Sequence, residues 1–409
     1  MIVELCDFES GDVFCMESEK KSLTEREINE KYEKGEARIV TEQGAIKLPL
    51  INSVFESNNY EKMPIYQRRI TWGNEKRSKL IESFIINIPV PPIFIYEVEF
   101  GKYEVMDGLQ RVSAIQDFYK DEYALEGLTE WSELNGMKYS ELPQKVKEGI
   151  DRRQISVITL LKESASNSLQ AQKMKRMVFE RLNTGGVKLQ AQEIRNALYD
   201  GKFNQLCKRL SENTFFREMW DIPTMPEKID DEATDLNEEI EFAKKIAQDK
   251  LYMRMYDVEL VLRFFAMRHL DEFTSLSDFL DAYLIFGNNK IQEHPEFEEK
   301  YEQLFVHEME KAYKLFGKKA FCIYSKYRGG FKWSSPNKMI YDPLMIALTG
   351  IEIDELSCDC KKNIEILKSK YSEINQDMFD GKRQSKSDIK KRSDFYYSLF
   401  NDITGVKHD

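Results

Sequence analysis

Residues 103–115 read Tyr103-Glu104-Val105-Met106-Asp107-Gly108-Leu109-Gln110-Arg111-Val112-Ser113-Ala114-Ile115. This stretch predicts a short strand, a polar turn at Gly108 and the start of a helix. The first N–H groups of a helix have no partner within it, and the helix dipole favours negative charge there. Since Asp107, Gln110 and Arg111 surround the glycine in sequence, the stretch indicates a phosphate or nucleotide site. The alternative is an ordinary helix start with a surface arginine, because strand–glycine–helix junctions are common.

Each polar residue of this turn suggests a chemical role. The guanidinium of Arg111 can form two hydrogen bonds to a phosphate and keeps its charge at any working pH. Asp107 can hold a divalent ion or fix a donor of a ribose or base, and Gln110 can orient a water, as glutamines do in some nucleotide hydrolases. Asp107, Gln110 and Arg111 are therefore candidate catalytic residues, and Asp107 is the candidate metal ligand.

The segments around this turn predict an α+β unit. An amphipathic helix is expected from about Asn74 to Ile88, followed after two prolines by a β-branched and aromatic strand, Ile93 to Val98. Gln154 to Leu161 is an apolar segment that predicts a buried strand. Arg38 to Leu50 has the pattern of a hairpin with its turn at Gln43-Gly44.

Two further polar segments are candidate ligand contacts. Tyr66-Gln67-Arg68 lies close before Trp72, and aromatic and arginine side chains suit stacking on a base or gripping a phosphate. The alternative there is a surface strand. Asn183-Thr184-Gly185-Gly186 follows a predicted helix, and its glycines let backbone N–H groups approach a ligand closely. Taken alone, that segment also fits a simple loop at a helix end.

Together these segments resemble the N-terminal domain of the GmrSD-type restriction endonucleases, which has a ParB/sulfiredoxin-like core. The family's hallmarks are a Tyr-Gln-Arg stretch before a Trp, a double-proline strand, a DGQQR turn, and an F-x-x-x-N-T-G-G loop followed by E-I-R-N-A. The matching residues here are Tyr66-Gln67-Arg68, Pro91-Pro92, Asp107 to Arg111, Phe179 to Gly186, and Glu193 to Ala197. The resemblance covers residues 46–198 well and continues weakly into the helical C-terminal half.

The resemblance implies nucleotide binding and hydrolysis at the D-G-x-Q-R turn, coupled to DNA cleavage in defence against phage. A nucleoside triphosphate and Mg²⁺ are the expected cofactors. The implied nucleotide contacts are Tyr66, Gln67, Arg68, Gly108, Arg111, Asn183, Thr184, Gly185 and Gly186. In this scheme Arg111 and the helix amides hold the phosphates, while Arg68 and Asn183 close the pocket.

This chain departs from the family pattern in two ways. Leu109 replaces the first glutamine of DGQQR, which predicts slow turnover or binding without hydrolysis. The HNH-type nuclease domain that often accompanies such domains has no counterpart here, because His294-Pro295 and His307 lack the partner residues that would hold a metal. A metal-dependent HNH cut by this chain alone is therefore not expected.

The C-terminal half is helical in pattern. We expect a ParB/sulfiredoxin-like nucleotide-binding domain over residues 1–205 and an all-helical domain over 206–409. Asp257 to His269 is apolar on most faces and predicts a buried helix. From Lys314 to Trp333 basic and aromatic residues alternate, so Lys326, Arg328 and Lys332 are candidate DNA contacts. The alternative for that segment is a helix and loop with a solvated face.

Composition limits the other function classes. The net charge of −11 argues against a non-specific nucleic-acid coat but permits a local basic groove. The chain has no C-x-x-C pair and no H-E-x-x-H motif, so a zinc finger or a zinc hydrolase is not expected. No apolar run approaches the roughly 18 residues of a membrane span, and the acidic N-terminus is unlike a signal peptide. We therefore expect a cytoplasmic protein that does not contact membranes.

The leading hypothesis is a nucleotide-binding and nucleotide-hydrolysing, DNA-directed protein of phage defence. The rival is a non-catalytic sensor of nucleotide or DNA that works with a separate nuclease or a modification-sensing partner. A third possibility is metal-assisted DNA cleavage by the N-terminal domain itself.

Overall fold

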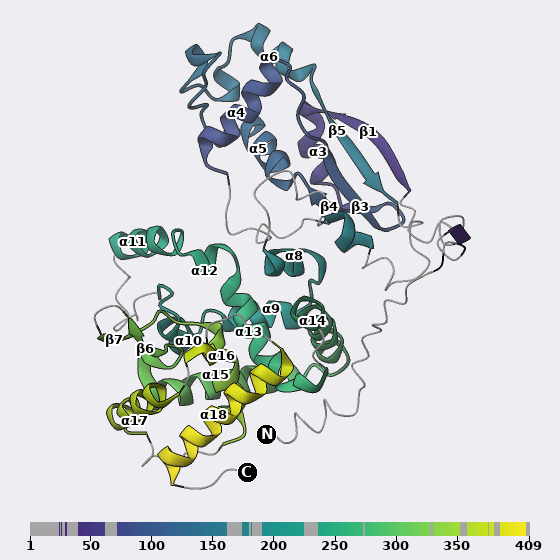
Figure 1. The fold of residues 1–409 in the computed structure, drawn as a ribbon. Helices are drawn as coiled ribbons and strands as arrows, with labels where there is room; N and C mark the ends of the chain where they lie inside the picture. The colour runs from purple at the N-terminus through teal and green to yellow at the C-terminus, as the bar shows by residue number, and fades with distance from the viewer. Residues whose placement is uncertain are drawn as a thin grey trace. The chain divides into compact units, whose positions relative to one another are not determined.

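The computed structural model describes residues 24, 26, 29–30, 40–61, 72–161, 174–179, 181, 190–224, 236–272, 275–327, 330–351, 358–374, 376–379 and 385–405. The chain forms two compact units that divide between Ile194 and Arg195. An α+β N-terminal unit followed by a helical C-terminal unit was predicted, and this class is confirmed (Figure 1). Among the described residues no helix is long and apolar enough to cross a membrane.

A five-stranded mixed sheet is the frame of the N-terminal unit, with the strand order β1-β5-β3-β4-β2 (Figure 1). The central strand β3 runs antiparallel to β4 and parallel to β5. β3 and β4 are joined by a tight turn at Gly101, whose φ of +75° suits glycine. The strands are β1 (Thr41–Lys47), β2 (Tyr60–Glu61), β3 (Ile93–Glu99), β4 (Lys102–Asp107) and β5 (Gln154–Leu160).

Four helices cover one face of this sheet and enclose its core. Side chains alternate between the two faces of a strand, so Ile93 and Ile95 of β3 both point to the helices and are buried. Ile81 of α4 and Ile115 of α5 complete the centre, and neither is exposed. The helices are α3 (Ile51–Phe55), α4 (Asn74–Ile85), α5 (Leu109–Tyr119) and α6 (Gln144–Asp151), with short 3₁₀ turns at η1 (Leu48–Leu50), η3 (Ser132–Leu134) and η4 (Tyr139–Glu141).

The predicted hairpin at Arg38–Leu50 is wrong over its described part. β1 runs straight through the expected turn, where Gln43 pairs with Ile158 and Gly44 with Val157. The reason is tertiary, because β5 offers a complete antiparallel partner to the whole of β1. A local glycine signal cannot anticipate a partner strand that lies so much later in the chain.

The C-terminal unit packs its helices around α13, in which every residue from Asp257 to Ala266 is buried. The buried helix predicted from Asp257 is therefore confirmed. The α13 helix spans Tyr256–Ala266, and the helices described around it are α9 (Lys202–Leu210), α10 (Thr214–Met219), α11 (Leu236–Ile246), α12 (Lys250–Met253), η7 (Met267–Glu272), α14 (Leu276–Glu293), α15 (Phe297–Phe316), η8 (Gly317–Lys319), α16 (Lys338–Thr349), α17 (Cys360–Glu373), η10 (Gln376–Phe379) and α18 (Lys386–Thr404).

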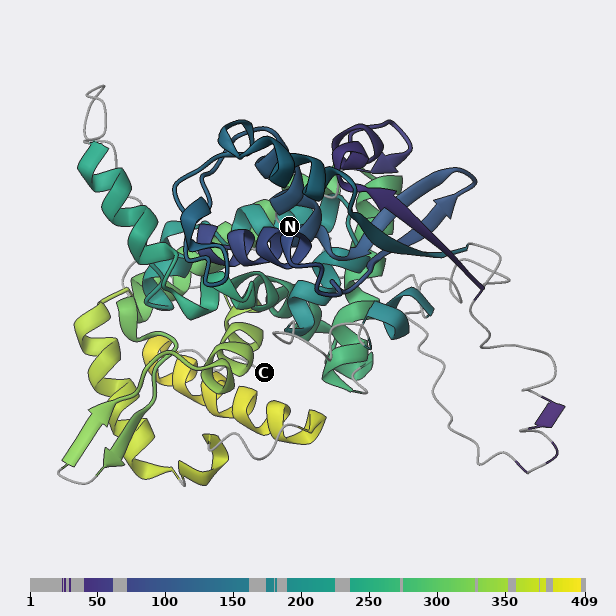
Figure 2. The same ribbon diagram turned by 90° about the horizontal axis from the view of Figure 1, so that it is seen from above.

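One β-hairpin adds to the helical unit. It consists of β6 (Tyr324–Tyr327) and β7 (Gly330–Trp333). Figure 2 shows it as two light-green arrows that project at the edge of the unit. The helix-and-loop alternative is thus wrong for residues 324–333, where two antiparallel strands pair and Tyr324 lies opposite Trp333.

The division between the units falls inside helix α8 (Ala191–Leu198), whereas the sequence placed the domain boundary at residue 205. The contacts of Arg195 explain why the helical unit begins at this residue and not at residue 206. Its Nη1 lies 3.0 Å from Glu259 Oε2, and its Nε lies 2.7 Å from Asp281 Oδ1. These buried ion pairs fix the second half of α8 in the helical unit.

Candidate nucleotide site

The turn between β4 and α5 depends on Gly108. Its φ of +99° lies in the left-handed region, which side-chain-bearing residues rarely adopt. A Cβ at this position would lie 3.0 Å from Arg111 Nη2 and 3.2 Å from Ile93 Cγ1. Glycine therefore both permits the turn and lets the Arg111 guanidinium lie directly against the backbone.

Arg111 is held by two hydrogen bonds from one nitrogen. Its Nη2 donates to Oδ2 of Asp107 at 2.8 Å and to the carbonyl oxygen of Pro92 at 3.0 Å. The side chain is 13% exposed, and its Nε is buried with no hydrogen-bond partner among the described residues. The structure thus brings Asp107, Gly108 and Arg111 together, as predicted, and adds the Pro92 carbonyl that the sequence did not single out. No local pattern singles out this contact, because every backbone carbonyl can accept a hydrogen bond and Pro92 comes from another segment of the chain.

Gln110 anchors the segment that precedes α4. Its Oε1 accepts a hydrogen bond from the backbone N–H of Trp72 at 3.0 Å. The ammonium group of Lys76 lies 4.7 Å from the Trp72 ring centroid, which is within the range of a cation–π contact. Trp72 is the first described residue after 62–71, so Tyr66, Gln67 and Arg68 lie outside the described residues.

Leu109, the departure from the DGQQR pattern, is partly buried and packs against the hydrophobic core of the N-terminal unit. It occupies the first helical position of α5. Leu109 therefore contributes to packing rather than offering a polar group to a ligand.

A buried polar cluster lies on the other face of the sheet. Glu104 of β4 is 7% exposed and forms a close ion pair with Lys175, whose ammonium group also lies 5.7 Å from the ring centroid of Tyr96. Burial raises the pKa of Tyr96, and the charges of Glu104 and Glu97 raise it further. This ion pair, which the sequence did not predict, ties the helical segment 174–179 to the strand that ends at the Asp107 turn. Asn183, Thr184, Gly185 and Gly186 lie outside the described residues.

A metal-binding cluster is not found in the described part of the chain, where no group of three or more His, Cys, Asp or Glu side chains could hold an ion. Asp107, the predicted metal ligand, offers one oxygen to Arg111 and retains Oδ1. Mg²⁺ is commonly bound through only one or two carboxylates together with the phosphates of a nucleotide. The residues present therefore fit a metal ion that arrives with its nucleotide better than a resident one.

The candidate DNA contacts are separated by the hairpin geometry. Lys326 lies directly opposite Phe331, and Lys332 lies opposite Ser325. Because side chains alternate along a strand, the two lysines point to opposite faces of the hairpin. Arg328 lies outside the described residues.

The aromatic residues of this hairpin are largely used in packing. Tyr324 stacks with Phe331 at a centroid distance of 5.5 Å, and Trp333 lies 6.4 Å from Tyr371 of α17. Phe331 remains 43% exposed. Of the hairpin aromatic side chains that the structure describes, Phe331 is therefore the most exposed one for stacking on a nucleic-acid base.

Comparisons with known proteins agree with the motifs. Residues 51–199 match the family model described as "GmrSD restriction endonuclease, N-terminal domain". No curated protein matches the chain. A solved Pnob8-like ParB-N domain aligns with 11% sequence identity over 90% of this chain and 99% of that one, at a TM-score of 0.22. So low a score carries no argument about the fold, and the ParB/sulfiredoxin-like core stays a prediction. The segment that contains the Asp107 turn is, however, similar to the N-terminal domain of GmrSD restriction endonucleases, as its motifs predicted.

Proposed function

We propose that the N-terminal unit binds a nucleoside triphosphate at the turn after β4, within a DNA-directed protein of restriction-like phage defence. The match of residues 51–199 to the GmrSD restriction endonuclease N-terminal domain supports the DNA-directed part. One observation carries the nucleotide part. The Arg111 guanidinium is fixed at a helix start by Asp107 and the Pro92 carbonyl.

This arrangement leaves donors for a phosphate. Both hydrogen bonds that Arg111 donates to Asp107 and Pro92 come from Nη2, so the N–H groups of Nη1 and Nε are the ones that a phosphate would take. The first backbone N–H groups of α5 lie next to them in the chain, and Gly108 caps this helix without a side chain. Helix amides together with an arginine form a common phosphate-binding set.

Asp107 serves this site by orienting Arg111. A carboxylate beside a phosphate is repulsive unless a cation lies between them, and Mg²⁺ bound to the triphosphate would supply that cation. Oδ1 of Asp107 is the oxygen that would contact it.

Gln110 has a positioning role in this proposal. Its carbonyl oxygen already accepts the Trp72 N–H, so orienting a water through that oxygen would require this bond to break. Its amide NH₂ group remains for a ligand. If the site hydrolyses its ligand, water would attack the γ-phosphorus of the nucleoside triphosphate, and the products would be a nucleoside diphosphate and inorganic phosphate.

A non-catalytic sensor is the second candidate, and the packing of Leu109 favours it. The family pattern has glutamine at this position, but here the side chain lies against the core. The site would then bind a nucleotide without hydrolysing it, and a separate nuclease or modification-sensing partner would act on the DNA.

The test is calorimetric titration of the full chain with each of the four nucleoside triphosphates in Mg²⁺. Arg111→Ala should weaken binding at least about tenfold, since a hydrogen bond to a charged group contributes roughly 1.5–3 kcal/mol. Arg111→Lys keeps the positive charge but loses the paired N–H donors of the guanidinium, so its nucleotide affinity should lie between those of the wild type and Arg111→Ala. Arg152→Ala removes an exposed arginine of the same unit and is the matched control.

Unchanged binding by a folded Arg111→Ala variant would exclude this site. Phosphate release, measured with and without DNA, separates the hydrolase from the sensor. A plasmid cleavage assay in Mg²⁺ tests whether the N-terminal domain itself cuts DNA.

A further inference from the structure

The β6–β7 hairpin lies in a segment whose charge is opposite to that of the whole chain. Residues 318–338 contain five lysines, one arginine and no aspartate or glutamate, whereas the chain has a net charge of −11. None of these five lysines is buried. A basic segment of this kind attracts polyanions. Since the hairpin projects at the edge of the helical unit (Figure 2), its partner is expected to be negatively charged.

The register of the hairpin divides its side chains between two faces. Tyr324 pairs with Trp333, and Lys326 pairs with Phe331. Paired residues point to the same face, and side chains two positions apart along a strand do so as well. These four side chains therefore lie on one face, which we call the aromatic face, whereas Lys332 lies on the other.

The aromatic face is held in place by α17. Trp333 lies 6.4 Å from Tyr371 of that helix, and Tyr324 lies 5.2 Å from Trp333, in each case between ring centroids. The Phe331 ring stacks on Tyr324 at 5.5 Å and an interplanar angle of 27°. The ammonium group of Lys368 lies 5.8 Å from the Tyr324 centroid. Phe331 is thus fixed in one orientation by rings that connect it to the core.

Phe331 is 43% exposed although it is fixed. Tyr324 stacks on one side of its ring, so the exposed surface belongs to the rest of the ring. A third planar group could extend this stack, and the bases of nucleic acids stack on aromatic side chains in this way. In a duplex the faces of each base are already covered by its neighbours, and removing a base from the stack costs free energy. An unpaired base is therefore favoured over a paired one.

Lys326 supplies the charge that a nucleic-acid strand requires. Cross-strand partners have Cβ atoms about 4.5–5.5 Å apart, so Lys326 lies beside the Phe331 ring, where the phosphate of a stacked nucleotide would be. Lys368 is less suited to this role, because it pairs with the exposed Glu365 at 2.7 Å. An acidic side chain of a protein could pair with Lys326, but it would supply no ring for Phe331.

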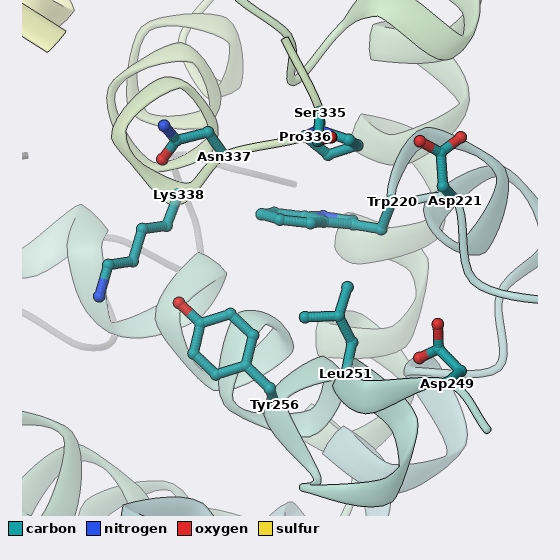
Figure 3. Close-up of a pocket in the computed structure, with 9 residues that line it drawn as sticks. All are labelled: Trp220, Asp221, Asp249, Leu251, Tyr256, Ser335, Pro336, Asn337 and Lys338. Atoms are coloured by element: carbon teal, nitrogen blue, oxygen red, sulfur yellow. The ribbon is translucent and has the colours of Figure 1, made fainter. Parts of the chain in front are cut away.

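The hairpin is also held at its base. Ile323 N donates to Ser334 Oγ at 3.1 Å, and Ser334 N donates to the Ile323 carbonyl oxygen at 2.9 Å. Beyond β7 the chain passes Ser335 and Pro336, which Figure 3 shows on the wall of a cavity of about 450 Å³. The indole at the centre of that cavity, Trp220, is only 4% exposed and offers no stacking surface. A stacking surface is present on the hairpin instead.

We propose that the aromatic face of the β6–β7 hairpin binds single-stranded DNA, with an unpaired base on Phe331 and a phosphate at Lys326. This inference rests on the DNA-directed part of the proposed function and does not involve the Asp107 turn. It assigns different roles to two of the candidate DNA contacts, because Lys326 shares a face with Phe331 and Lys332 does not.

The test is fluorescence anisotropy of the full chain with a labelled single-stranded oligodeoxynucleotide, the duplex of the same sequence, and polyglutamate as a polyanion without bases. The single strand should bind most tightly. Phe331→Ala and Phe331→Leu should weaken its binding about tenfold, because both remove the ring. Phe331→Trp keeps a ring and should bind at least as tightly as the wild type. Thermal unfolding checks that each variant folds.

Lys326→Met tests the phosphate contact. It should weaken binding of the single strand and reduce the slope of log affinity against log salt concentration by about 0.7, the value for one phosphate contact on a single strand. Lys332→Met removes a lysine from the same hairpin on the opposite face and is the matched control, which should keep the wild-type slope.

Three results would overturn the assignment of this face. They are tighter binding of the duplex than of the single strand, equally tight binding of polyglutamate, and wild-type binding of the single strand by folded Phe331→Ala and Lys326→Met variants. Each of them leaves the DNA-directed function in place or unaddressed, whereas binding of no DNA at all would contradict that function too. The Arg111→Ala variant should bind the single strand as the wild type does, so the nucleotide site is tested separately.

Discussion

Arg111 and Asp107 are joined by a hydrogen bond of 2.8 Å across the turn that starts α5, and the same nitrogen of Arg111 holds the carbonyl of Pro92 at 3.0 Å. One guanidinium therefore ties together the end of β4, the entry to β3 and the first turn of α5. The direction of this arginine is set by the fold before a ligand binds. Such preorganisation lowers the entropy cost of binding.

The close contact between Gly108 and Arg111 gives a first prediction. Gly108→Ala should lower the free energy of unfolding by about 1–2 kcal/mol because alanine is strained in a left-handed backbone conformation. The close contacts of the new Cβ with Ile93 and Arg111 should add to this loss. It should also weaken nucleotide binding. Gly101→Ala is the matched control, since Gly101 has a φ of +75° and nothing within 4 Å of the added Cβ. Urea unfolding and calorimetry check both, and equal effects of the two variants would contradict the prediction.

The bond between Gln110 and Trp72 gives a second prediction. Gln110→Ala removes the acceptor of the Trp72 N–H, and one such hydrogen bond contributes about 1 kcal/mol. Amide hydrogen exchange at Trp72 should therefore become roughly fivefold faster, because RT is about 0.6 kcal/mol. Gln116→Ala, on the same helix, should leave it unchanged. Equal protection of Trp72 in both variants would show that this bond does not hold the segment.

The buried Glu104–Lys175 ion pair gives a third prediction. The side chains are 9% and 12% exposed, so Lys175→Met leaves a buried carboxylate without its partner and should cost about 3 kcal/mol or more. Adding Glu104→Leu should restore most of that loss. Urea unfolding of the single and double variants measures it. Lys145→Met, at an exposed lysine of α6, should change stability by no more than about 0.5 kcal/mol. No recovery in the double variant would mean that the pair is not coupled.

Glu308 on α15 gives a prediction about pH. Burial raises its pKa above 4.5, against the opposing charge of Lys311, whose Nζ donates to Glu308 Oε1 at 2.8 Å. At pH values between the unfolded and folded pKa of Glu308, the folded state binds more protons than the unfolded state. The contribution of Glu308 to the free energy of unfolding is therefore complete below about pH 4.5, and it is lost as the pH rises through the folded pKa. Glu308→Gln should remove this decline.

Urea unfolding at a series of pH values measures the effect of Glu308. Glu310→Gln is the control with the opposite sign, because the Lys314 hydrogen bond lowers the pKa of the exposed Glu310. Its carboxylate adds stability above the unfolded pKa that is lost as the pH falls. An identical pH slope in the wild type and in Glu308→Gln would contradict the assignment.

Local sequence signals predicted the elements next to the candidate site. The helix expected at Asn74–Ile88 is α4, which ends at Ile85, and the strand expected at Ile93–Val98 is β3. Apolar spacing and proline or glycine positions suffice for these, because the stabilising contacts repeat every few residues. β1 was mistaken for a hairpin because its partner, β5, is distant in sequence.

The polar residues of the turn can be recognised from the chain alone, since Asp107, Gly108, Gln110 and Arg111 are neighbours and need only a strand-to-helix junction to meet. Their contacts depend on the packing of distant segments. The tertiary structure placed the Pro92 carbonyl on Arg111 and the Trp72 amide on Gln110, and it turned Leu109 to the core. Those contacts arise from the packing of β3 and α4 beside α5, and no pattern within a single segment records how separate segments pack.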